Sequence, residues 1–564
     1  MNRRGKYAII GLVFAAIVII ITISSAIIKK YKPSKEVMDL DDYYVVNEDE
    51  ALVVFQDGIY EKKAIFEDGA IYLDYDTTVN LLNKRFYWDT KENLLIFTTP
   101  TKYIRTEIGS KSFSINKNNE ELNHPVTKSK DGILYIAIDF IDEYSDMEYQ
   151  FLENPNRVMI KKDWGQYLFS AVEKDTQMRV ADSIKSEVLL ELTAGTELIY
   201  IDNDTVYKDG FCKMINDEGV IGFVRSKDVS ESEYKEVKSS FVKEEYVQTK
   251  KVEPIKLVWH QVTNQDANNN LLNNLDGTKG VTTISPTWYS ITSNEGTISS
   301  LADETYVSRA HSLGIEVWAL IDDFNTEVDM EEVLSRTSRR EKLINELISS
   351  AIKYDLDGIN IDFEKISQDG GIHYIQFLRE LSIRCRSNGL VLSTDNYVPT
   401  EYSSYYDIGE QGVVVDYVVI MAYDEHYRGS DKSGPVASIN FVEDAIEKTL
   451  AMVPKEKTLI GIPFYNRMWK EDDSGIVEVI DLAMTNAEDM FRVNGVEPAW
   501  DSQTGLSYGE YENDGFTYKM WLEDEASIDL KLKTIKESGV AGIGAWKLDL
   551  EKEEIWNVIN KYLN

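Results

Sequence analysis

The sequence has few of the residues that build disulfide frameworks or zinc sites. Its 564 residues include 2 cysteines, Cys212 and Cys385, and 5 histidines. One pair of cysteines cannot form a disulfide framework, and neither cysteine has neighbours at metal-ligand spacing. The histidines are scattered and form no HxxxH or HExxH pattern. The sequence therefore predicts no metal site and no cofactor, and it argues against a zinc hydrolase.

Positive charge is also scarce. The chain has 60 Lys and Arg against 97 Asp and Glu, which gives a formal net charge of −37. Because so acidic a surface repels polyphosphate, we expect no nucleic-acid partner. Apolar residues make up 43% of the chain, so each domain can build a core without disulfide support. At roughly 150 residues per domain, the length suggests about three or four domains.

One long hydrophobic run lies at the N-terminus. Residues 8–28 are apolar except for a few small or hydroxyl-bearing side chains, and about 21 such residues can cross a hydrocarbon core of roughly 30 Å. We therefore expect a short cytoplasmic tail at 1–6 and an uncleaved transmembrane anchor at 7–28, with the rest of the chain on the cell-wall side. Basic residues flank the run on both sides and do not fix its orientation. Ser24-Ser25-Ala26 also fits a cleavage site, and cleavage there would give a secreted protein.

The next stretch, residues 36–163, is rich in short β-type runs separated by Asp-Gly or Asn turns. Ile71-Tyr72-Leu73 is one example. The pattern resembles the small α+β module named after the N-terminal domain of copper amine oxidases. His124 is the only histidine in the stretch, so no copper site follows from the name. The pattern is equally compatible with a plain α+β spacer.

A second small module follows at residues 165–233, where short strands recur at the spacing of a small β-barrel. Gly195-Thr196 and the closing Gly222-Phe223-Val224 resemble the corresponding parts of a bacterial SH3 domain. Such modules bind cell-wall peptides or merely space a catalytic domain, and both roles remain open here. Residues 234–253 are polar, charged and free of glycine, which suits a linker or a short solvated helix.

The remaining residues, 254–564, alternate β-type runs with amphipathic helical stretches. Eight strands are expected, at 256–259, 282–285, 316–320, 358–362, 391–394, 417–421, 458–462 and 541–546. Eight strands with intervening helices predict an α/β fold of the (β/α)₈ TIM-barrel type. In such barrels the site forms at the C-terminal ends of the strands, where polar residues collect in this sequence.

The fourth expected strand ends in a cluster of polar residues. Since side chains alternate along a strand, Asn360, Asp362 and Glu364 share one face. Acidic side chains in a barrel mouth are costly unless they pair or serve a function. The segment Asp357 to Glu364 resembles DGxDxDxE, the signature of glycoside hydrolase family 18, with Asn360 at an inner acidic position.

Three later motifs resemble the same family in the expected order. Met421-Ala422-Tyr423-Asp424 matches M-x-Y-D, and the segment that ends at Arg467 is similar to GxPxYGR with Asn466 in place of glycine. Trp546 ends the eighth strand, where the family has the aromatic floor of its −1 sugar site. The resemblance covers residues 254–564 and implies the barrel fold for them.

The resemblance implies retaining catalysis in which the substrate's own N-acetyl oxygen attacks the anomeric carbon. Glu364 would be the general acid and base, Asp362 would orient the acetamide, and Tyr423 would donate a hydrogen bond to its oxygen. Met421, Asp424, Arg467 and Trp546 would bound the −1 sugar. Because Asn360 removes a carboxylate that could share a proton with Asp362, we expect Asp362 to stay ionised more readily.

The 2-acetamido requirement restricts the substrate to N-acetylhexosamine glycans: peptidoglycan, chitin or N-glycans. An anchor and wall-type modules favour peptidoglycan, cleaved at the β-1,4 bond after N-acetylglucosamine. A chitinase, a non-catalytic glycan-binding protein and a wall tether are the alternatives. About 70 residues separate Arg467 from the eighth strand, which favours an open cleft over a tunnel. Its aromatic residues either line that cleft or pack the core of a small insertion: Trp469, Trp500, Tyr508 and Trp521.

Overall fold

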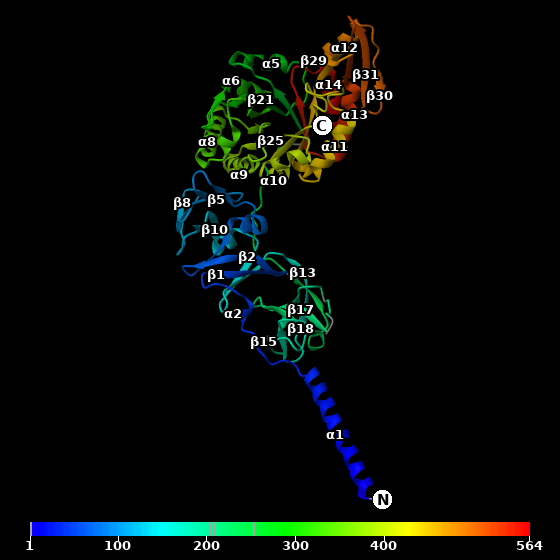
Figure 1. Cartoon of the computed structure of the whole chain (residues 1–564). Coiled ribbons are helices and arrows are strands. Elements are labelled where there is room, and N and C mark those ends of the chain that lie inside the picture. Colours follow the sequence, from blue (N-terminus) through cyan, green and yellow to red (C-terminus); the bar gives the residue numbers. More distant parts are fainter. Residues whose placement is uncertain (1–2, 204, 208–209, 250, 252–253) are drawn as a thin grey trace. The chain divides into compact units, whose positions relative to one another are not determined.

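A computed structural model describes residues 3–203, 205–207, 210–249, 251 and 254–564. The first two residues of the expected cytoplasmic tail and residues 250, 252 and 253 of the expected linker lie outside this description. The chain divides into two compact units, one formed by Met1–Phe86 with Arg105–Lys243 and the other by Tyr87–Ile104 with Glu244–Asn564 (Figure 1).

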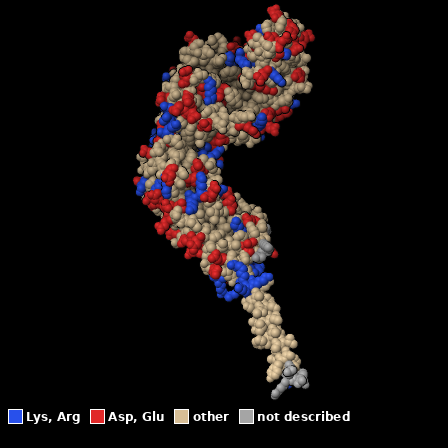
Figure 2. All heavy atoms as spheres, in the orientation of Figure 1, with Lys and Arg blue, Asp and Glu red and all other residues tan. Residues whose placement is uncertain are grey.

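The first unit begins with α1 (Arg3–Tyr31), a single continuous helix. Its segment Gly5–Tyr31 is long and apolar enough to cross a membrane, a test that a signal sequence also passes. Figure 2 shows Lys and Arg gathered where the helix meets the folded part of this unit. Residues 7–28 of the helix carry no charged side chain. In the sequence, Lys29, Lys30, Lys32 and Lys35 directly follow the apolar run.

A seven-stranded sheet of order β11-β12-β1-β2-β3-β10-β9 follows. Its strands are β1 (Glu50–Phe55), β2 (Gly58–Glu67), β3 (Ala70–Asp74), β9 (Thr127–Lys130), β10 (Ile133–Ala137), β11 (Glu148–Leu152) and β12 (Arg157–Lys161). Further elements are α2 (Leu40–Tyr43), α3 (Tyr75–Thr77) with the π-turn Thr78–Leu82, β6 (Tyr103–Glu107), β7 (Ser112–Ile115), β8 (Asn118–Glu121) and α4 (Ile138–Tyr144). The stretch is thus α+β, as its turn-rich pattern predicts.

The other sheet of this unit has the order β15-β14-β18-β17-β16-β13-β19 and is antiparallel throughout. Its strands are β13 (Gly165–Ala171), β14 (Thr176–Arg179), β15 (Val188–Leu192), β16 (Glu197–Tyr200), β17 (Phe211–Ile215), β18 (Ile221–Arg225) and β19 (Glu233–Val237), with a 3₁₀ turn at Ser226–Asp228. Its core buries Met178, Leu198, Cys212 and Met214. This is the small β-domain that the strand spacing predicts.

The second unit is dominated by a closed barrel of eight parallel strands, which confirms the predicted TIM-type fold (Figure 1). The strands are β20 (Ile255–His260), β21 (Thr283–Ile291), β23 (Glu316–Asp322), β24 (Gly358–Asp362), β25 (Val391–Tyr397), β26 (Tyr417–Met421), β27 (Thr458–Pro463) and β33 (Gly542–Trp546). Pairing of β20 with both β21 and β33 closes the ring. β22 (Ile298–Ser300) adds an antiparallel strand to β21.

Helices surround the strands: α5 (Leu271–Asn274), α6 (Glu304–Ser312), α7 (Met330–Leu334), α8 (Thr337–Tyr354), α9 (Gly371–Ser387), α10 (Ile408–Val414), α11 (Ile439–Leu450), α13 (Glu525–Ser538) and α14 (Glu553–Tyr562). Three 3₁₀ turns lie at Gln265–Asn270, Glu401–Tyr406 and Lys455–Lys457. Local sequence sets the ends of α13, since Asp524 accepts a hydrogen bond from the Ser527 amide at 2.9 Å and Gly539 ends it with φ of 74°. The hairpin of β4 (Tyr87–Asp89) and β5 (Leu94–Thr98) belongs to this unit.

A small α+β insertion separates β27 from β33. It contains α12 (Met484–Val493) and a sheet of order β29-β28-β32-β31-β30, built from β28 (Tyr465–Asp472), β29 (Gly475–Ala483), β30 (Ala499–Asp501), β31 (Leu506–Asn513) and β32 (Phe516–Leu522). Trp469 is fully buried, and the rings of Tyr508 and Trp521 pack 4.7 Å apart. Trp500 is 47% exposed. These aromatic residues belong to the insertion, and none of the four lines the barrel-mouth cavity described next.

Candidate active site

A cavity of about 670 Å³ opens at the C-terminal ends of the barrel strands. Six of the predicted site residues line it: Asp362, Glu364, Met421, Tyr423, Asp424 and Trp546. Asn360 lies below them with no exposed surface, and Arg467 lines an adjoining hollow of about 500 Å³. The two hollows share Asp424, Tyr427 and Trp546. The structure therefore brings all eight predicted residues to one end of the barrel.

Glu364 lies just beyond the end of β24 and has the properties of a general acid. Its backbone amide donates to Asp323 Oδ1 at 3.0 Å, which fixes the turn, and the Tyr397 hydroxyl donates to its carboxylate. Burial raises the pKa of Glu364, the hydrogen bond from Tyr397 lowers it, and the nearby charge of Asp323 raises it again. The net rise favours the protonated form of Glu364 more than in a free glutamic acid.

Asp362 ends β24 and is 5% exposed. Its Oδ1 makes no hydrogen bond within the described part of the chain. Burial raises the pKa of Asp362 well above its usual value, and the neighbouring charge of Asp395 adds to the rise. The expectation that Asp362 stays ionised more readily is therefore wrong, first because Asp362 is buried and second because a carboxylate that the motif comparison missed lies on the next strand.

Asn360 is held by hydrogen bonds on both sides of its amide. Its Nδ2 donates to Asp395 Oδ1 at 2.8 Å and to Ser393 Oγ at 3.0 Å. Its Oδ1 accepts from Trp259 Nε1 at 3.1 Å and from Ser285 Oγ at 3.0 Å. These contacts connect four strands beneath the cavity. Both N–H groups and the oxygen of the Asn360 amide are hydrogen-bonded.

Aromatic side chains form the wall and floor of the cavity. Tyr423 packs edge-on against Trp259 and Tyr465, with 6.4 Å between ring centroids in each pair. Burial raises the pKa of Tyr423 well above its usual value, so the phenol stays protonated and can donate a hydrogen bond. The rings of Trp546 and Trp259 lie 6.0 Å apart, and this pair offers an apolar surface on which a sugar face can stack.

The sequence of the barrel matches a known enzyme family. The family model for glycosyl hydrolases family 18 matches residues 258–551, more than half of the chain. The chain belongs to glycoside hydrolase family 18. A second model, for the copper amine oxidase N-terminal domain, matches residues 55–160 of this family 18 protein. The resemblances to family 18 and to the copper amine oxidase N-terminal module are confirmed, and the resemblance of residues 165–233 to a bacterial SH3 domain stays a prediction.

Relatives of this family 18 protein include a protein named as a glycosylase and one named as a lytic enzyme. It is 33% identical over 242 residues to "Putative sporulation-specific glycosylase YdhD" of Bacillus subtilis (strain 168), covering 40% of this chain and 55% of that protein. It is 27% identical over 249 residues to the cortical fragment-lytic enzyme of Bacillus anthracis, covering 42% of this chain and 57% of that enzyme. The chain thus spans little more than half the length of these relatives.

Among solved structures, that of the Bacillus cereus spore cortex-lytic enzyme SleL is similar to this family 18 protein. The TM-score is 0.50 at 22% identity, and the match covers 55% of this chain and 74% of that chain. At this identity the similarity supports the fold alone.

Arg467 of the family 18 barrel holds Asp424 in position. Its Nη1 donates to Asp424 Oδ1 at 2.8 Å, and its Nε donates to Asp481 Oδ1 at 2.8 Å. The Tyr465 hydroxyl donates to the same oxygen of Asp424. Asp424 itself has φ of 59°, so its backbone turns sharply after β26. We infer that Arg467 fixes a strained cavity residue rather than reaching deep into the main cavity.

Four residues of the family 18 site were not predicted: Trp259, Asp323, Asp395 and Tyr397. Asp395 and Tyr397 occupy alternate positions on β25, as Asp362 and Glu364 do around the end of β24. Applying the alternation test to every expected strand end would have found them. Trp259 on β20 and Asp323 after β23 carry no such local signal, since hydrogen bonds to distant residues define their roles.

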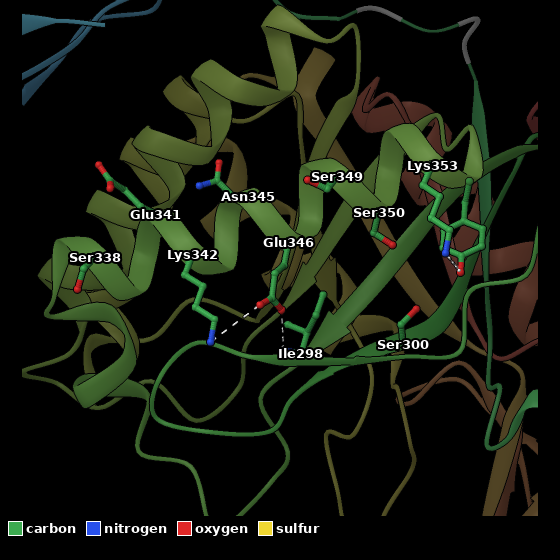
Figure 3. A pocket seen from close by; sticks show the side chains of 11 residues that line it. Ile298, Ser300, Ser338, Glu341, Lys342, Asn345, Glu346, Ser349, Ser350 and Lys353 are labelled. Atoms are coloured by element: carbon green, nitrogen blue, oxygen red, sulfur yellow. Dashed lines mark hydrogen bonds and ion pairs between the residues drawn. The ribbon is translucent and has the colours of Figure 1, made fainter. Parts of the chain in front are cut away.

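A separate hollow of about 690 Å³ lies on the flank of the barrel between β22 and α8 (Figure 3). Among its charged side chains, Lys342 pairs with Glu346 at 4.0 Å and Lys353 donates to the Tyr354 hydroxyl at 2.9 Å. No buried carboxylate is among the lining residues of this hollow. The flank hollow therefore lacks the chemistry of the barrel mouth.

Proposed function

We propose that this chain is a membrane-anchored glycoside hydrolase that cleaves the β-1,4 bond after N-acetylglucosamine in bacterial peptidoglycan. The main support for the proposal is the pair of carboxylates at the end of β24, which have different surroundings. Glu364 has a raised pKa that suits an acid, and beside it Asp362 has a buried oxygen without a hydrogen-bond partner in the described chain. Such an oxygen is costly to bury unless a ligand satisfies it.

The proposed reaction retains configuration and uses the substrate as its own nucleophile. Glu364 gives its proton to the glycosidic oxygen as the bond to the anomeric carbon breaks, while the acetamide oxygen attacks that carbon. Asp362 accepts the acetamide N–H and, once ionised, balances the positive charge of the cyclic intermediate. Glu364, now ionised, takes a proton from the water that opens this intermediate.

The other cavity residues position the −1 sugar in this scheme. Tyr423 donates a hydrogen bond to the acetamide oxygen and aligns it for attack. Trp546 supplies the floor, Met421 a side wall, and Asp424 accepts a hydrogen bond from a sugar hydroxyl. The contacts of Arg467 with Asp424 support this placement.

Two observations favour peptidoglycan over other N-acetylglucosamine glycans. The named relatives include a cortical fragment-lytic enzyme, and α1 is long and apolar enough to hold the chain at a membrane. We propose that α1 is an uncleaved anchor with the barrel on the cell-wall side, next to its substrate. The small modules of the first unit then act as spacers or wall contacts.

The test uses the full chain in detergent with purified peptidoglycan and, separately, with chitin oligomers. Mass spectrometry should detect muropeptides that end in reducing N-acetylglucosamine. Glu364→Gln should lower turnover by about 10²–10⁴-fold, because it removes the acid and base while keeping the shape of the side chain. Glu346→Gln in the flank hollow is the matched control and should keep wild-type turnover.

Each other outcome has a distinct meaning. Cleavage of chitin oligomers alone would keep the mechanism and refute the peptidoglycan assignment. Binding without cleavage of either glycan would make the barrel a lectin. Equal turnover by Glu364→Gln would refute the role of Glu364.

A further inference from the structure

Asp395 is a buried carboxylate that the proposed reaction does not yet use. It lies on β25, is 2% exposed, and lines the same cavity as Asp362 and Glu364. β24 and β25 pair in parallel with Asn360 opposite Ser393 and Ile361 opposite Thr394. Continuing that register by one residue puts Asp395 opposite Asp362, at the spacing of neighbouring strands, roughly 4.8 Å.

The surroundings of the two carboxylates are unequal. Asp395 accepts hydrogen bonds on both oxygens, from Asn360 Nδ2 at 2.8 Å and from Trp259 Nε1 at 3.1 Å. Asp362 has one oxygen without any such donor in the described structure. Donors stabilise an anion, so the charge of the pair rests on Asp395 and the proton on Asp362 while the site is empty.

Few cations act on the pair. The charges that act on Asp362 come from Asp395, Glu364, Asp323 and Asp322. The charge that acts on Asp395 comes from Glu364. Lys365 acts on Glu364, and the neighbouring Tyr423 is neutral. Burial raises the pKa of Asp395 to about 7 despite its two donors. Two adjacent buried carboxylates in such surroundings share one proton.

We propose that Asp395 is the proton partner of Asp362, supplying from β25 the carboxylate that Asn360 does not supply from β24. As the acetamide nitrogen becomes positive, the O–H bond of Asp362 breaks and an O–H bond forms on Asp395. Asp362 is then the anion beside the positive nitrogen, and the site neither gains nor loses a proton. Asp395 touches no reacting atom, so it is a positioning residue. The proposal rests on the proposed function.

The test removes the carboxylate of Asp395 from β25 and then restores a carboxylate at position 360 on β24. Asp395→Asn keeps the size and removes the proton acceptor, and it should lower kcat/KM at least about tenfold. It also removes a negative charge near Glu364, which lowers the pKa of that acid. The alkaline limb of the pH profile should therefore move down by about one pH unit.

Adding Asn360→Asp to Asp395→Asn restores one carboxylate on the neighbouring strand. This double variant should recover kcat/KM to within about threefold of wild type and return the alkaline limb to its position. A purely structural role for Asp395 predicts no recovery and no shift of the limb. Either result would overturn the proposal. Asp355→Asn, an exposed position before β24 at the opposite end of the barrel, is the matched control and should leave the profile unchanged.

Two further measurements test the shared proton independently of the double variant. Asn360→Asp alone adds a carboxylate, so it should raise the alkaline limb even if Asp395→Asn does not fold, and an unmoved limb would contradict the shared proton. If wild type cleaves neither glycan, the proposed function fails by itself. The pair is then tested by calorimetric binding of an N-acetylglucosamine trimer, whose pH dependence should change in Asp395→Asn, and an unchanged dependence would overturn the proposal.

Discussion

The hydrogen bond from Tyr397 to Glu364 sets the upper pH limit of activity in this account. Glu364 must be protonated to act as an acid, so kcat/KM falls as the pH rises through its pKa. The Tyr397 hydroxyl donates to the Glu364 carboxylate and thereby stabilises its ionised form. Tyr397→Phe removes this stabilisation. The pKa of Glu364 should rise, and the alkaline limb should move to higher pH.

The size of the shift follows from the exposure of Tyr397. A hydrogen bond to a charged group contributes about 1.5–3 kcal/mol, and one pKa unit corresponds to about 1.4 kcal/mol. Tyr397 is 47% exposed, so solvent screens part of this interaction. We expect a shift of about one pH unit.

The assay is kcat/KM on purified peptidoglycan across the pH range, using the full chain in detergent. Tyr402→Phe is the matched control because Tyr402 is 92% exposed, and its profile should equal that of wild type. A Tyr397→Phe limb that stays in place, or moves to lower pH, would refute the assignment of this limb to Glu364.

Two other predictions concern buried charges. Lys531 donates to both carboxylate oxygens of Glu523, at 2.7 and 2.8 Å. Lys531→Met leaves the buried Glu523 without its partner and should lower the free energy of unfolding by about 3–5 kcal/mol in denaturant titrations. Adding Glu523→Leu to this variant should recover part of the lost stability. A change below about 0.5 kcal/mol would show that the pair is not desolvated. Arg467→Lys cannot reproduce the fork to Asp424 and Asp481, so it should raise KM several-fold with a smaller change in kcat. A loss confined to kcat would place Arg467 in the chemical step instead.

The sequence predicts the barrel and most of its mouth because both depend on local patterns. Strand alternation puts Asn360, Asp362 and Glu364 on one face without any knowledge of their neighbours. The eight expected strands all lie within or next to the observed ones because most are short runs of apolar and β-branched residues.

The parts that the sequence does not predict depend on register and long-range packing. Asp395 meets Asn360 only because β24 and β25 pair with Asn360 opposite Ser393. The substitution at Asn360 taken alone predicts a more readily ionised Asp362, whereas burial together with the charge of Asp395 raises the pKa of Asp362. The pKa of a buried group depends on every charge around it, and a linear motif contains only some of them.

The stereochemistry of the first product shows whether this barrel uses substrate-assisted retaining catalysis. Full chain should be mixed with glycan strands of peptidoglycan and followed at once by proton NMR of the newly formed reducing N-acetylglucosamine. Because the acetamide oxygen is the nucleophile, the β-anomer should appear first, and strands whose glucosamine is N-deacetylated should not be cleaved. Initial release of the α-anomer, or equal cleavage of the deacetylated strands, would contradict substrate-assisted retaining catalysis by this barrel.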